Sequence, residues 1–187
     1  MSNLVITIGR QCGSRGKTIG KKVAEALGVK CYDKELLTEA AKHSGLCEEL
    51  FETHDEKPTN SFLYSLVMDT YSLGYTTSAY MDMPINHKIF LAQFDTIKKL
   101  ADQESCVIVG RCSDYTLRDN KNCLRVFFCA PMENRMKRVM ERRHLSEKDA
   151  RQKIQKEDKW RADNYRYYTG RIWGAAGNFD LTVNTAL

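Results

Sequence analysis

The apolar positions of this chain alternate between short runs and longer stretches in which apolar residues recur every three or four positions. Short apolar runs are typical of strands buried on both faces, and the longer periodic stretches are typical of helices packed on one side. Strands are predicted at residues 4–8, 29–32, 106–110, 124–129 and 179–183. Strands that alternate with helices in this order predict an α/β fold around a parallel sheet.

Helices are predicted between these strands. Residues 17–27 have apolar side chains four positions apart, at Ile19, Val23 and Leu27, and Gly28 follows as a typical helix end. Other predicted helices follow favourable start residues: 34–44 after Asp33, 85–102 after Pro84, a basic helix after Pro131, and 147–168 after Ser146 in a capping box with Asp149. The segment 46–83 lacks a clear pattern, because its first part is acidic and polar and only residues 61–74 are compatible with a helix.

The composition is that of an ordinary globular protein with one domain. The chain has 187 residues, of which 42% are hydrophobic and 28% charged, enough for one well-filled core. It has no apolar run long enough to cross a membrane and no leader-peptide pattern at its N-terminus, which predicts a cytoplasmic location. The seven cysteines include no C-x-x-C pair, so we expect neither a disulfide framework nor a zinc site.

The net charge of +5 is concentrated in one part of the chain. Residues 133–171 contain 13 Lys or Arg against 7 Asp or Glu, whereas the remaining residues contain 16 against 17. A surplus confined to one segment predicts a face or pocket that binds a polyanion.

The segment ITIGRQCGSRGKT, residues 6–18, lies between the first predicted strand and the first predicted helix. In a phosphate-binding loop (P-loop), backbone N–H groups surround the phosphates, a lysine contacts the outer phosphates, and a hydroxyl binds Mg²⁺. Gln11 stands at the place of the first glycine of that motif, so the loop is a variant. Cys12 has two interpretations, a thiolate favoured by the helix N-terminus or a buried apolar side chain. The nucleotide-binding residues of the loop would be Gly13, Ser14, Arg15, Gly16, Lys17 and Thr18.

Several motifs, in this order and spacing, resemble those of the cytidylate kinase-like family of bacterial P-loop kinases. They are ITIGRQCGSRGKTIGKKVAEALG, YDKELL, CVIVGRCSDYTL, CAPMENRMKRV and DKWRADNYRYYTGRIWG, and together they extend over nearly the whole chain. The resemblance implies a three-layer α/β/α fold with a five-stranded parallel sheet, formed by one domain over residues 1–187. Its parts would be a core of residues 1–33, 105–132 and 170–187, a helical acceptor-binding insertion at about 34–104, and a basic lid at about 133–169.

The resemblance also implies a reaction, the transfer of phosphate from ATP with Mg²⁺ to a nucleoside monophosphate, with CMP or dCMP as the first candidate. Lys17 would hold the β- and γ-phosphates, and Thr18 would bind Mg²⁺. In the lid, Arg161 and Arg166 would approach the transferred phosphate, and Arg135 and Arg138 would contact the donor. The acceptor would be bound by Asp33, Arg111 and Asp163, although Asp33 could instead simply cap the helix that follows it.

Two positions depart from the family pattern, since Val109 and Cys112 stand where cytidylate kinases carry aspartates. Other functions therefore stay open. One is a kinase for another small acceptor, and another is a nucleotide-binding regulator with little catalytic activity. A third, a nucleic-acid surface on the basic helices, agrees less well with arginines at the positions of a lid. The oligomeric state and the acceptor do not follow from the sequence.

Overall fold

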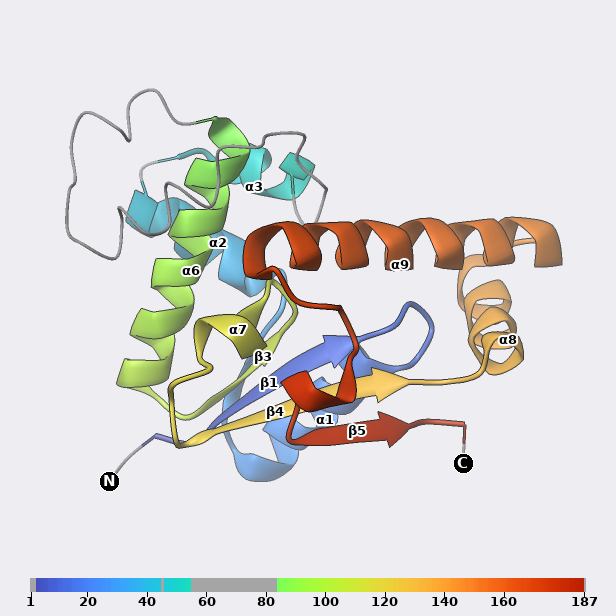
Figure 1. Ribbon diagram of the computed structural model, residues 1–187, viewed down its shortest axis with the longest axis horizontal. Coiled ribbons are helices and arrows are strands. Elements are labelled where there is room, and N and C mark those ends of the chain that lie inside the picture. The colour runs from blue at the N-terminus through green and yellow to red at the C-terminus, as the bar shows by residue number, and fades with distance from the viewer. Residues whose placement is uncertain (1–2, 45, 55–83, 187) are drawn as a thin grey trace.

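The computed structural model describes residues 3–44, 46–54 and 84–186, and its centre is a five-stranded sheet (Figure 1). The strands are β1 (Val5–Arg10), β2 (Lys30–Tyr32), β3 (Cys106–Val109), β4 (Cys123–Cys129) and β5 (Leu181–Asn184). Their order across the sheet is β2-β3-β1-β4-β5, and all neighbouring strands are parallel. The predicted parallel sheet is therefore confirmed, and each predicted strand is present with small shifts of its ends.

Helices cover both faces of the sheet, which confirms the three-layer architecture. On one face lies α1 (Gly16–Leu27), whose buried Ala24 packs in a cluster with Ile8 of β1. On the other face lie α6 (Ile85–Gln103) and the short α7 (Ser113–Thr116). Successive side chains of a strand point to opposite faces of the sheet. In β1, Val5 therefore points away from Ile8, and it packs in the cluster that contains Ile97 and Leu100 of α6 and Leu117 after α7.

Two short helices, α2 (Glu35–Ser44) and α3 (Glu48–His54), pack beside α6. The second of these is absent from the predictions, because its sequence is acidic and polar. Its Phe51 side chain is fully buried in a cluster with Leu37, Ala40 and Ile89, and Leu50 packs against that cluster. Burial against neighbouring helices thus stabilises a helix that its local sequence does not indicate. The helix considered for residues 61–74 lies outside the described residues.

The basic segment forms the two predicted helices, α8 (Met132–Arg143) and α9 (Glu147–Thr169). The Ser146 side chain accepts a hydrogen bond from the backbone N–H of Asp149, as the predicted cap requires. In Figure 1, α9 runs from α8 across the sheet to α6. A short 3₁₀ helix, η1 (Ala176–Asn178), then leads into β5. None of the helices in the described ranges combines the length and apolar character needed to span a bilayer.

Candidate active site

The loop between β1 and α1 contains the tight turns that the sequence predicts. Gly13 and Arg15 have φ angles of 80° and 64°, in the left-handed region that favours glycine. A Cβ atom on Gly13 would lie 2.9 Å from the backbone oxygen of Arg135. Glycine is therefore required here by its backbone conformation and by the close approach of α8. Lys17 and Thr18 follow in the first turn of α1, with exposed side chains.

We expect Gly13→Ala to distort this loop, because alanine is strained at this φ and its methyl group would displace α8. The free energy of unfolding should fall by about 1 to 3 kcal/mol, and affinity for Mg·ATP should fall with it. Titration calorimetry with Mg·ATP, together with urea unfolding, measures both effects. Gly177→Ala is a matched control, since its Cβ would meet no atom within 4 Å. Unchanged affinity in Gly13→Ala would show that the loop does not need this conformation.

Gln11, at the position of the motif's first glycine, connects the loop to the end of β4. Its backbone N–H donates to the Phe128 oxygen at 3.0 Å, and its side-chain Oε1 accepts from the backbone N–H of Ala130 at 3.1 Å. Its own carbonyl oxygen accepts from the N–H of Ser14 at 3.2 Å. The glutamine therefore anchors the beginning of the loop, and residues 14–18 keep the composition of a P-loop.

Asp33, which follows β2, lies between the P-loop and the end of β3. One oxygen of its carboxylate pairs with the ammonium group of Lys17, and the other accepts from Arg111 Nη1 at 2.8 Å. Arg111 Nη1 also donates to the backbone oxygen of Val109 at 2.8 Å. Burial would raise the pKa of Asp33, but the charge of Arg111 and the hydrogen bonds from Lys17 and Arg111 hold it below its ordinary value. These contacts favour a site residue over a simple helix cap.

The turn that carries Arg111 is strained. Gly110, Arg111 and Cys112 are consecutive residues in the left-handed region, with φ angles of 80°, 52° and 54°. Such a conformation costs roughly 1 to 2 kcal/mol for each residue other than glycine, and it persists only where the surrounding structure fixes it. In this turn, the buried guanidinium of Arg111 reaches back to Asp33.

A small pocket lies at the carboxyl ends of β1 and β3, beneath α9. Three arginines line it, Arg10 from β1, Arg111 from the strained turn and Arg161 from α9. The connection after β1 leads to β2 and the connection after β3 leads to β4, in opposite directions across the sheet, so the pocket lies at the topological switch point, where open α/β sheets bind ligands. Three guanidinium groups around one small pocket fit an anionic ligand.

Asp114 also lines this pocket, and the sequence does not single it out. Its carboxylate is buried and accepts a hydrogen bond from the Tyr165 hydroxyl at 2.6 Å. Burial raises the pKa of Asp114, and the hydrogen bond from Tyr165 opposes the rise only in part. The resemblance to cytidylate kinases leads to the expectation of a carboxylate at the position of Cys112. In this chain, a carboxylate two positions later reaches the pocket, because the turn before α7 directs that residue inward.

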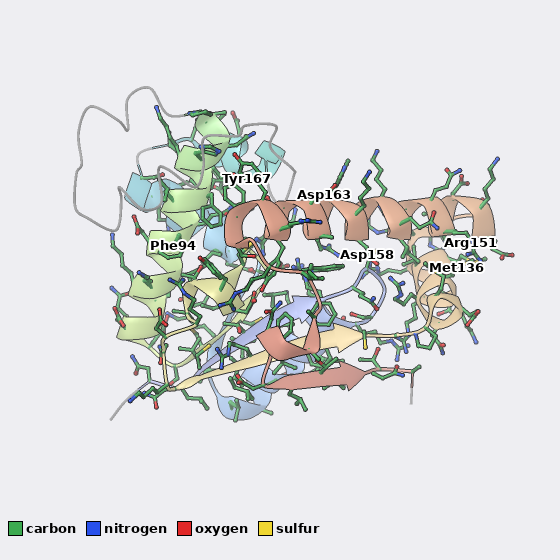
Figure 2. All side chains as sticks on the ribbon, viewed as in Figure 1. Phe94, Met136, Arg151, Asp158, Asp163 and Tyr167 are labelled. Atoms are coloured by element: carbon green, nitrogen blue, oxygen red, sulfur yellow. The ribbon has the colours of Figure 1, made fainter. Side chains whose placement is uncertain are left out.

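The lid residues predicted on α9 are only partly brought to the pocket. Arg161 lines it, whereas Asp163 and Arg166 are exposed, and Figure 2 shows Asp163 on the side of α9 away from the sheet. Asn164, one position later than Asp163, stands in the pocket wall. The reason is helical spacing: the buried side chains Ile154, Tyr165 and Tyr168 set the inner face of α9, together with Asp158 and Arg161.

Arg135 and Arg138 were expected at the ATP phosphates or adenine, but both are bonded to the P-loop itself. Arg135 is buried, pairs with Asp158 and donates to the backbone oxygen of Cys12 at 3.3 Å. Arg138 donates to the Gly13 oxygen at 3.3 Å and to Thr185 Oγ1 at 3.0 Å. In this arrangement the two arginines support the loop from α8, and their direct contact with the donor stays a prediction.

Cys12 is a buried side chain and not a thiolate. Burial raises the pKa of its thiol to about 12, and a hydrogen bond to the Glu157 carboxylate adds to the rise. We therefore expect iodoacetamide at pH 8 to modify the exposed Cys47 and to leave Cys12 unmodified in the folded protein. Peptide mass spectrometry measures both, with urea-unfolded protein as the control. Equal labelling of the two thiols would show that Cys12 is accessible and ionised.

A model of the cytidylate kinase-like family matches residues 5–187. Among solved structures, an uncharacterized protein from Eubacterium ventriosum has 29% identity and a TM-score of 0.68, over 97% of this chain and 88% of that one. A shikimate kinase from Bacteroides thetaiotaomicron has 16% identity and a TM-score of 0.53, over 97% of this chain and 86% of that one, a likeness of fold alone. No curated protein matches.

Proposed function

Because this chain belongs to the cytidylate kinase-like family, we propose that it transfers the γ-phosphate of ATP to a small anionic acceptor, with CMP or dCMP as the first candidate. One observation carries the proposal: the buried carboxylate of Asp33 binds both Lys17 of the P-loop and Arg111, which lines the small pocket beneath α9. A donor loop and an anion pocket are thus joined by one group. Phosphoryl transfer depends mainly on such positioning and on cations around the moving group.

The residues of the P-loop fit a nucleoside triphosphate with Mg²⁺. Ser14 Oγ is fully buried and has no hydrogen-bond partner among the described residues, and a phosphate oxygen would satisfy it. The hydroxyl of Thr18 and the carboxylate of Asp33 would hold Mg²⁺, which usually takes its remaining ligands from phosphates and water. Bound Mg²⁺ would neutralise part of the negative charge of the phosphates.

The cations of the site have distinct proposed roles. The Lys17 side chain is 48% exposed, so its ammonium group can turn from Asp33 to the outer phosphates. Arg111, with a side chain only 2% exposed, would hold the anionic group of the acceptor in a fixed place, and Arg10 would add a second charge there. Arg161 approaches from α9 and would stabilise the negative charge of the transferred group.

The position of Asp114 favours a second candidate function, in which the phosphate is transferred to a small acceptor that carries a hydroxyl group besides its anionic group. Its buried carboxylate lies in the same pocket as the three arginines. A carboxylate at that place can accept a hydroxyl proton during transfer, a role that a nucleoside monophosphate does not require.

An ADP-release assay with Mg·ATP tests the proposal against a panel of nucleoside monophosphates and small hydroxylated acids, with Lys17→Ala as control. We expect release that depends on CMP or dCMP and is lost in the variant. Release that depends only on a hydroxylated acid would support the second candidate. Tight binding of ATP without release for any acceptor would contradict both and indicate a nucleotide-binding regulator.

A further inference from the structure

Cys12, the second residue of the P-loop, is hydrogen-bonded to α8 and α9 through its backbone N–H and its carbonyl oxygen. Its backbone N–H donates to Asp158 Oδ1 at 2.7 Å, and its carbonyl oxygen accepts from Arg135 Nη1 at 3.3 Å. The Glu157 carboxylate lies close to the Cys12 thiol and contributes to the raised pKa of that thiol. Arg135 and Asp158 are themselves an ion pair. The P-loop is therefore fastened to α9 directly, in addition to its covalent links to β1 and α1.

The same two carboxylates also contact Arg161, about one turn further along α9. Arg161 Nη1 lies 3.9 Å from Asp158 Oδ1, and Arg161 Nη2 lies 3.6 Å from Glu157 Oε2. Residues three and four positions apart share one side of a helix, and Figure 2 shows Asp158 on the side of α9 that faces the sheet. Asp158 thus stands between the P-loop and an arginine of the pocket.

The burial of Asp158 and Arg135 limits the positions that α9 can take relative to the P-loop. The side chains of Asp158 and Arg135 are only 17% and 8% exposed, and charges with so little access to water are stable only when each is paired. A shift of α9 relative to the loop would separate Asp158 from the Cys12 N–H and from Arg135 together. The contacts therefore hold the loop and the helix in one relative position.

We propose that Asp158 is a positioning residue that holds the P-loop at Cys12 and the guanidinium of Arg161 as one unit. ATP bound at the loop would then fix Arg161 at the acceptor pocket. Asp158 acts through its neighbours, because its contacts are with Cys12, Arg135 and Arg161, whereas residues 14–18 would bind the phosphates. The inference rests on the proposed function, since it requires ATP at this loop.

Hydrogen–deuterium exchange with and without saturating Mg·ATP tests the inference without the need for a known acceptor. In the wild-type protein, ATP should slow exchange in peptides of the P-loop and also, by about threefold or more, in the α9 segment 157–164. In Asp158→Asn, which has the same size without the charge, protection of the P-loop should persist and protection of α9 should disappear. Glu147→Gln, an exposed change on the same helix, should behave as the wild type.

The outcomes separate the inference from the proposed function. ATP-dependent protection of α9 that persists in Asp158→Asn overturns the inference. Loss of protection at both the loop and α9 in this variant also overturns it, because Asp158 would then only maintain the fold of the loop. If Asp158→Asn does not fold, Asp158→Glu keeps the charge, displaces it by one methylene group, and is subject to the same criteria. Absence of P-loop protection in the wild-type protein contradicts the proposed function itself.

Discussion

Replacement of Lys17 by alanine is expected to lower kcat by about a hundredfold to a thousandfold, the usual cost of removing a charged group that stabilises a transition state. Lys17 stands at the start of α1, and its ammonium group is within reach of both Asp33 and the place of the phosphates. Its removal takes away a cation just where negative charge spreads over the transferred group. Steady-state kinetics with Mg·ATP and an acceptor identified in the panel measure this effect.

The control for this prediction is Lys22→Ala, an exposed lysine on the same helix outside the loop. This change should leave kcat as in the wild type, although it removes the same charge from the same helix. Thermal unfolding of both variants checks that the fold is retained, which we expect because the Lys17 side chain is half exposed. Wild-type activity in Lys17→Ala would show that the P-loop lysine does not take part in transfer.

The second large effect is expected for the stability of Arg111→Ala. The guanidinium of Arg111 and the carboxylate of Asp33 are both buried, and removal of one partner leaves the other without its main compensation. Breaking such a pair typically costs about 3 to 5 kcal/mol. Urea unfolding at pH 7 should show a decrease of this size in the free energy of unfolding of Arg111→Ala.

The pH dependence and a second variant test the cause of this decrease. Because the pKa of Asp33 in the folded protein lies below its ordinary value of 3.8, the stabilisation is present above that value and is lost as the pH falls through the folded pKa. The difference between wild type and Arg111→Ala should therefore shrink in acid. The double variant Asp33→Asn/Arg111→Ala should lose less than the sum of the single changes. Additive losses, or a loss below about 1 kcal/mol at pH 7, would show that the pair is not coupled.

Most of the fold follows from the sequence because its signals are local. Apolar runs mark the strands, and Gly28, Pro84 and Ser146 mark helix ends or starts that the structure contains. The helix α3 does not follow from the sequence, because it depends on burial of Phe51 against α2 and α6. Contacts between elements distant in the chain are the information that local patterns lack.

The same distinction applies to the site. The P-loop is recognisable because its residues are consecutive. The bond between Cys12 and Asp158 joins residues 146 positions apart, and no local pattern predicts it. The sequence does contain a pattern that places Asp158 on the inner face of α9. Ile154, Asp158, Arg161 and Tyr165 follow one another at helical spacing and define that face. With that register, Asn164 would have been expected near the pocket in place of Asp163.

The surplus of positive charge in residues 133–171 is divided between two environments. Arg135, Arg138 and Arg161 turn inward to the P-loop or the pocket, whereas others such as Arg151, labelled in Figure 2, are exposed. Total charge alone predicts an anion-binding region but does not say which arginines face it. The inward group agrees with a phosphorylated ligand held between the loop and α9.

The transfer of phosphate is tested most directly by following the γ-phosphate of ATP. The protein is incubated with Mg²⁺, [γ-³²P]ATP and CMP, or the acceptor that the panel identifies, and the products are separated. If the protein is a kinase, label appears in the phosphorylated acceptor, such as CDP, and this labelling is lost in Lys17→Ala. Label that stays in ATP, or that moves only to inorganic phosphate, would contradict the assignment of this protein as a kinase.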